Sequence, residues 1–165
     1  MTDLTAQERL QPSLLDRLTD TDPENKSEPR ERRVLSFQRL KAGVLRDLAW
    51  LLSTGYLETF VDLDEHPHAR NSVVNYGLPD LTGVSVANMD SSRLEKIVRE
   101  AIVKFEPRIN QRTLKVQVAV DRDRMHRNAM TFRIEGELWA QPAPLALSLR
   151  TELDLETGNV DVREG

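Results

Sequence analysis

The sequence of 165 residues contains no cysteine, few aromatic residues and no long apolar run. The missing cysteines exclude a disulfide framework and a thiolate site, and they are compatible with a reducing cytoplasm. The N-terminus lacks the apolar core of a signal peptide, and no stretch approaches the roughly 20 apolar residues that span a bilayer. We therefore expect a protein that is not exported and does not insert into a membrane.

An excess of positive charge is also missing. The formal net charge is -4 at pH 7, and acidic and basic residues are mixed along the chain. Nucleic acids and anionic membranes attract basic surfaces, so this composition argues against both as partners.

Recognisable catalytic motifs are scarce as well, because the sequence has no phosphate-binding glycine loop, serine-nucleophile elbow or thiol. His66 and His68 flank a proline without a matched set of acidic ligands, so we expect loop residues, no metal and no cofactor. Two carboxylates across a cleft would suffice for a glycosidase, and Asp62, Asp64 and Glu65 lie close together. In so charged a chain such a cluster is more typical of a solvated loop, and we assign no catalytic residue.

The clearest element that the sequence does contain is a helix from Ser92 to about Glu106. Ser92 is placed to cap its start, with Glu95 at the reciprocal capping-box position, and Pro107 is placed to end it. Apolar residues recur through this segment at helical spacing: Leu94, Ile97, Val98, Ala101, Ile102 and Phe105. We expect one face in the core and the other in solvent.

Glu106, Pro107 and Arg108 follow this helix at a corner where a strand pattern begins. One interpretation is a helix terminator with two solvated charges. The other is a charge pair that docks onto a partner, since the planar guanidinium of arginine can bind a carboxylate with two hydrogen bonds. Spacing alone leaves both interpretations open.

Residues 1–30 read as a flexible, polar N-terminal arm with three prolines and one short amphipathic motif. Leu14, Leu15 and Leu18 fall on one side of a helix too short to bury them, so they need a surface of this chain or of a neighbour. We predict that these leucines bind protein.

Residues 31–165 are expected to form one α+β domain. A second helix is predicted from between Arg30 and Ser36 to about Ser53. A long ordered loop follows, and loops of such length are typically functional. Its expected apolar anchors are Val73, Val74, Tyr76, Leu78, Leu81 and Val84. Alternating patterns then predict an antiparallel β-meander of three to four strands, with the two main helices packed on one face: residues 114–120, 130–140, 145–155 and 160–162.

Four segments, taken together, resemble the TssE family of type VI secretion baseplate subunits, which are related to the small wedge protein of tailed-phage baseplates. These are residues 12–18 (PSLLDRL), 47–52 (DLAWLL), 72–83 (SVVNYGLPDLTG) and 106–109 (EPRI). The resemblance implies a non-enzymatic subunit that forms a wedge with TssF and TssG and nucleates the TssB/TssC sheath. It also implies a cytoplasmic location at the inner membrane, as part of a baseplate through which the chain would be linked indirectly to TssK.

The resemblance also bears on individual residues. The family's Glu-Pro-Arg motif falls on Glu106, Pro107 and Arg108, where it is implicated in holding the wedge together, and this favours the docking interpretation. The family's label as lysozyme-like keeps a peptidoglycan glycosidase as the alternative. Since sheath subunits of contractile machines exchange strands, we expect the free edge of the sheet, either 113–120 or 145–155, to accept strands from TssB or TssC.

Overall fold

The structure is a computed structural model that describes residues 13–19, 37–80, 90–119, 129–139, 144–154, 157 and 160–165. Most of the expected N-terminal arm, the start of the second helix, and Leu81 to Met89 lie outside these described residues. So does most of the turn expected between the last two strands.

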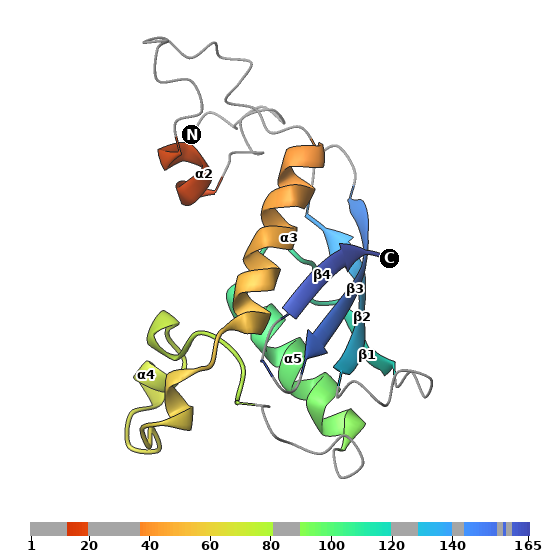
Figure 1. Ribbon diagram of the computed structural model, residues 1–165. Coiled ribbons are helices and arrows are strands. Elements are labelled where there is room, and N and C mark those ends of the chain that lie inside the picture. Colours follow the sequence, from red (N-terminus) through yellow and green to blue (C-terminus); the bar gives the residue numbers. More distant parts are fainter. Residues whose placement is uncertain are drawn as a thin grey trace.

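The strands form one antiparallel sheet in sequence order, β1-β2-β3-β4 (Figure 1). Their bounds are β1 Lys115–Ala119, β2 Ala129–Leu138, β3 Leu145–Asp154 and β4 Val160–Glu164. Alternate residues of β3, among them Leu147, Leu149 and Leu153, are buried, as an alternating apolar pattern predicts for a sheet covered on one face.

Two helices cover that face: α3, Phe37–Ser53, and α5, Ser91–Phe105. Their apolar stripes join the buried face of the sheet in one core, to which α3 contributes Val44 and Leu48 and α5 contributes Val98 and Ile102. The predicted α+β fold, a four-stranded meander with two main helices on one face, is therefore confirmed. None of the helices in the described ranges has the length and apolar character needed to cross a membrane.

The start of α5 differs from the prediction. Asp90 is the N-cap, and its carboxylate accepts hydrogen bonds from the backbone N–H groups of Ser92 and Arg93 at 3.0 and 3.3 Å. The cap expected at Ser92 is therefore wrong, because the helix already begins at Ser91 and the carboxylate of Asp90 satisfies its first unpaired N–H groups. Glu95 makes no capping box and instead accepts a hydrogen bond from Val118 N at 2.8 Å.

The sheet edges also correct one expectation. β3 pairs with β2 along Leu145–Asp154, and on its other side Leu149–Leu153 pair with β4, so the edge expected at 145–155 is covered except at its first residues, Leu145–Leu147. The edges are β1 and β4. On β1 the outward N–H of Val118 is already occupied by Glu95 of α5, which blunts that edge.

Residues 56–80, called the lobe from here on, extend from the C-terminal end of α3 (Figure 1). The lobe contains three short helices, η2 Leu57–Thr59, α4 Pro67–Arg70 and η3 Val73–Asn75. Its two ends are tied by Tyr56 N to Leu78 O at 2.9 Å and Leu78 N to Thr54 O at 2.8 Å. Of the expected apolar anchors, Leu78 is buried in the core and Tyr76 packs against it, whereas Val73 and Val74 are exposed and anchor nothing here.

Candidate functional site

The corner after α5 is fixed by backbone hydrogen bonds on both sides. Glu106 closes the helix, with its N–H donating to Ile102 O at 2.8 Å, and Pro107 follows where a further helical N–H would be needed. Arg108 O then accepts from Trp139 N at 2.7 Å, and Asn110 N donates to Glu137 O at 2.8 Å. The corner is thereby joined to the end of β2.

The side chain of Glu106 is buried, with the residue only 3% exposed. Its Oε1 accepts hydrogen bonds from Arg108 N and Nε at 3.2 and 2.6 Å, and its Oε2 accepts from Arg108 Nη2. The interpretation of two solvated charges is therefore wrong for Glu106. The pair forms a fork that sets the direction of the arginine.

Arg108 links this corner to α3, because its Nη2 also donates to Asp47 Oδ2 at 2.5 Å. Burial by itself would lower the pKa of Arg108, but the hydrogen bonds and charges of Glu106 and Asp47 outweigh it and raise that pKa. The guanidinium is charged under all ordinary conditions. Its Nε and Nη2 are engaged by these contacts, and its Nη1 faces α3, 3.7 Å from where a Cβ on Gly43 would lie.

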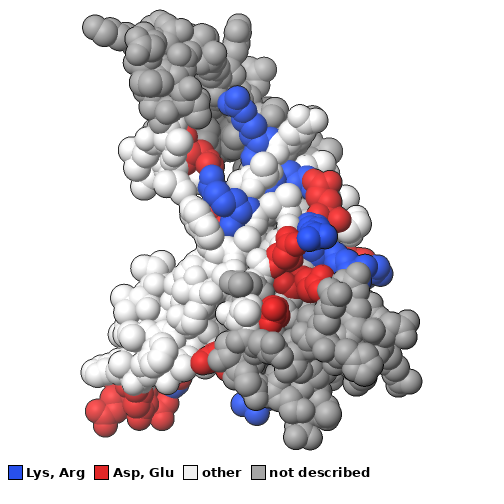
Figure 2. All heavy atoms as spheres, in the orientation of Figure 1, with Lys and Arg blue, Asp and Glu red and all other residues white. Residues whose placement is uncertain are grey.

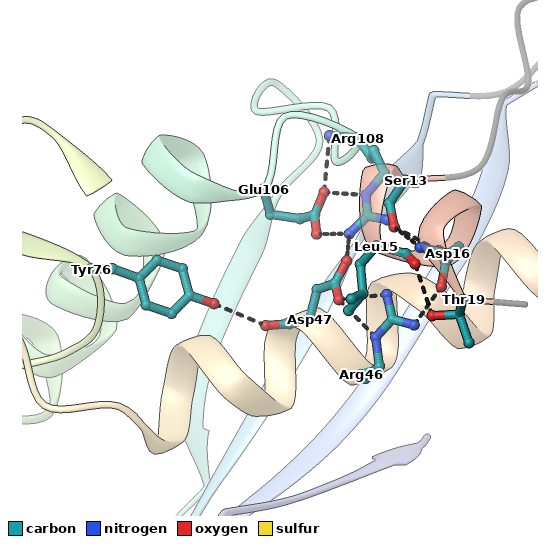
Figure 3. A network of polar contacts seen from close by, with 9 residues as sticks. All are labelled: Ser13, Leu15, Asp16, Thr19, Arg46, Asp47, Tyr76, Glu106 and Arg108. Atoms are coloured by element: carbon teal, nitrogen blue, oxygen red, sulfur yellow. Dashed lines mark hydrogen bonds and ion pairs between the residues drawn. The ribbon is translucent and has the colours of Figure 1, made fainter. Parts of the chain in front are cut away.

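The network continues from α3 to α2, the short helix Leu14–Leu18 (Figure 3). Arg46 donates from Nε to Asp47 Oδ1 at 3.0 Å and from Nη1 to Asp16 Oδ1 at 2.5 Å. Ser13 Oγ donates to the other oxygen of Asp16 at 2.7 Å. Hydrogen bonding to Arg46 holds the pKa of Asp16 below its ordinary value. The polar side of α2 is thus attached to α3.

An open hollow of about 380 Å³ lies beside this network. Its apolar lining comes from Trp50, Leu51, Tyr76 and Phe105, and the Glu106 to Arg108 corner forms part of its wall. The rings of Tyr76 and Phe105 meet edge to face with centroids 5.1 Å apart. The hydroxyl of Tyr76 donates to Asp47 O at 3.3 Å, as Figure 3 shows. Apolar walls next to a fixed arginine suit a protein side chain or peptide.

The leucines of α2 are not buried by this attachment. Leu14, Leu15 and Leu18 are 70, 44 and 74% exposed. The sequence left open whether this chain or a neighbour would cover these leucines, and the described part of this chain does not cover them. Their role in binding another protein stays a prediction.

Sequence reasoning found Glu106 and Arg108 but missed Asp47 as the partner of Arg108, and it missed Arg46 and Asp16, which extend the network from Asp47. Asp47 lies 61 residues before Arg108, and no local spacing connects them. The signal that was present is the set of four segments quoted for the family resemblance. Each of them contributes to this network: Asp16, Asp47, Tyr76, and the Glu106–Arg108 pair.

The residues weighed for metal binding and catalysis lie elsewhere, in the lobe. Asp64 binds Arg70 Nη2 at 2.6 Å, and Asp62 accepts a hydrogen bond from Asp64 N at 2.9 Å. His66 and His68 are exposed. Within the described ranges, no three histidine or acidic side chains are grouped closely enough to hold a metal ion.

Comparison with known proteins shows the family of the chain. The sequence model of the family described as baseplate wedge protein gp25 matches residues 38–143, which include α3, the lobe, α5, the corner and β2. No curated protein and no solved structure gives a significant match. Because the match spans more than half of the chain, this protein belongs to the baseplate wedge protein gp25 family.

Proposed function

We propose that this chain is a non-enzymatic structural subunit of a type VI secretion baseplate, which binds TssF and TssG to form a wedge. The observation that carries the proposal is the meeting of four sequence segments at one polar network beside an apolar hollow. A residue pair that only ended a helix would not need a partner on α3. In this proposal the network holds Arg108 in place as part of the wall of the hollow, where it contacts TssF or TssG while apolar side chains of that partner enter the hollow.

The same network argues against the glycosidase alternative. Asp47 and Glu106 are the two carboxylates at the hollow, and both accept hydrogen bonds from Arg108. A glycosidase needs one of its two carboxyl groups to donate a proton to the leaving oxygen. Carboxylates that accept hydrogen bonds from an arginine are poorly suited to donating a proton, whereas they are well suited to positioning that arginine.

The wedge would lie at the cytoplasmic face of the inner membrane, near TssK. Strands from the first ring of TssB/TssC sheath subunits would add to the β-sheet of this chain. β4 supports this part of the proposal. Gly165 N donates to Ser148 O at 3.0 Å, and in an antiparallel pair alternate residues point toward and away from the partner. The N–H groups of Val160, Val162 and Glu164 therefore face away from β3, where an added strand would bind them.

Co-purification tests the proposed function. Tagged wild-type chain, expressed with TssF and TssG, should recover both proteins. Arg108→Ala should lose them, and it should stay folded with a lower free energy of unfolding, because it leaves the buried carboxylate of Glu106 without its partner. Arg108→Lys is the matched control for charge, since it keeps the cation but cannot make the fork. We expect it to bind weakly. Wild-type protein that recovers neither TssF nor TssG, or that clears purified peptidoglycan by itself, would contradict the proposal.

A further inference from the structure

The lobe holds together by a polar network of its own. Arg70 Nη2 binds Glu58 Oε1 and Asp64 Oδ1. Asn75, only 4% exposed, accepts a hydrogen bond from Glu58 N at 2.9 Å and donates to Arg70 O at 3.2 Å. Leu63 is buried within it and does not belong to the main core. These contacts fix the shape of the lobe before any partner arrives.

This ordered lobe nevertheless exposes large apolar side chains. Phe60 and Val73 are 80 and 78% exposed, and Val61 and Val74 are exposed next to them in sequence. Apolar groups scattered singly on a surface need no explanation, but four on one small preformed lobe indicate an interaction surface. Phe60 and Val61 follow η2, and Val73 and Val74 belong to η3. Hydrogen bonds between Glu58 and Asn75 join these two helices.

The charge of the lobe says what kind of surface would cover it. Residues 56–80 contain five carboxylates and one arginine, a net charge of -4, which equals that of the whole chain. The rest of the protein is therefore formally neutral. Figure 2 shows a largely uncharged surface over the lobe with acidic side chains at its outer end. An anionic lipid layer or a nucleic acid would repel this acidic lobe, and so would the lobe of a second copy.

We propose that the lobe is a second docking surface, distinct from the Arg108 corner, which inserts its apolar side chains into a recess of a wedge subunit rimmed by lysine and arginine. This inference rests on the proposed function. Apolar side chains in the recess would supply most of the affinity, and the acidic rim would speed association and fix orientation. The internal network of the lobe reduces the ordering cost of binding.

The test uses full-length protein and the purified TssF–TssG complex, with the dissociation constant measured at two salt concentrations. Phe60→Ser combined with Val73→Ser should weaken binding at least about tenfold. The matched variant, Phe60→Leu with Val73→Ile, keeps the apolar surface and should stay within about threefold of wild type. Asp62→Asn with Glu65→Gln should slow association and reduce its dependence on salt. Because these side chains are exposed, all variants should unfold at the wild-type temperature.

Three outcomes overturn the inference in distinguishable ways. If the serine variant binds as tightly as wild type while Arg108→Ala fails to bind, the lobe is no docking surface and the proposed function survives. If wild-type protein does not bind TssF–TssG at all, both are overturned. Loss of self-association by the serine variant, with TssF–TssG binding unchanged, would assign the lobe to a second copy and also overturn the inference.

Discussion

At the scale of single residues, Glu106 has a structural task that is separate from docking. Its carboxylate is buried and accepts from Arg108 N and Nε, and a buried donor left without its acceptor costs about 1–3 kcal/mol. We expect Glu106→Ala to lower the free energy of unfolding by that amount in urea denaturation of the isolated chain. Glu106→Gln keeps one acceptor oxygen and should lose less. A change below about 0.5 kcal/mol for the alanine variant would show that the pair contributes nothing to the fold.

Gly77 supports the attachment of the lobe. Its φ of +121° is unfavourable for other residues, and an added Cβ would lie 2.2 Å from Thr54 O. Gly77→Ala should therefore cost more than about 2 kcal/mol in local stability and make the lobe sensitive to protease. Gly55→Ala is the control, because an added Cβ there meets no atom within 4 Å. Equal protease resistance of both variants would contradict this role of Gly77.

At the scale of elements, α2 is attached to α3 by charge more than by apolar contact, because its leucines are exposed. The pKa of Asp16 is lowered in the folded protein from an ordinary value of 3.8. A group with a lowered folded pKa stabilises fully above its unfolded value and loses that contribution as pH falls through the folded value. We expect α2 to stay attached at pH 5 and to detach progressively below about pH 4.

The amide resonances of Thr19 and Asp16 report this detachment in an NMR titration. Thr19 N donates to Leu15 O at 3.0 Å, so its signal should move toward a random-coil position as the helix separates. Asp16→Asn should show the detached spectrum already at neutral pH and lose the dependence on acid. If its spectrum matches wild type, the Arg46 contact does not hold α2.

Elements with a clear local period were predictable from sequence, whereas contacts between them were not. The apolar spacing of α5 and the alternation of β1 to β3 located these elements to within a few residues. Pro107 located the corner, since its effect on the backbone is local. The partner of Arg108 on α3 and the exposure of Val73 depend on how distant segments pack, which no spacing encodes. The cap lies at Asp90 because two nearby residues can each cap a helix, and the helix begins at the earlier of the two.

At the scale of the whole molecule, assembly depends on which sheet edge can take a further strand. β1 has its outward Val118 N–H occupied by Glu95, and the outward donors of β4 have no such contact among the described residues. An added strand needs those donors and the carbonyl groups between them. We therefore expect sheath subunits to bind at β4. The sequence predicted β4 as a short fourth strand, but it did not indicate that β4 is the accepting edge.

Val162→Pro tests this edge, because proline removes one outward donor and edge strands tolerate it. Val162→Ala is the matched control, since it also loses the half-buried side chain but keeps the N–H group. We expect the proline variant to bind TssF and TssG normally and to stop sheath formation, measured by imaging of a labelled sheath subunit in cells. The alanine variant should still form sheaths. Sheaths in the proline strain at wild-type number would contradict strand addition at β4, and loss of sheaths in both strains would assign the effect to packing.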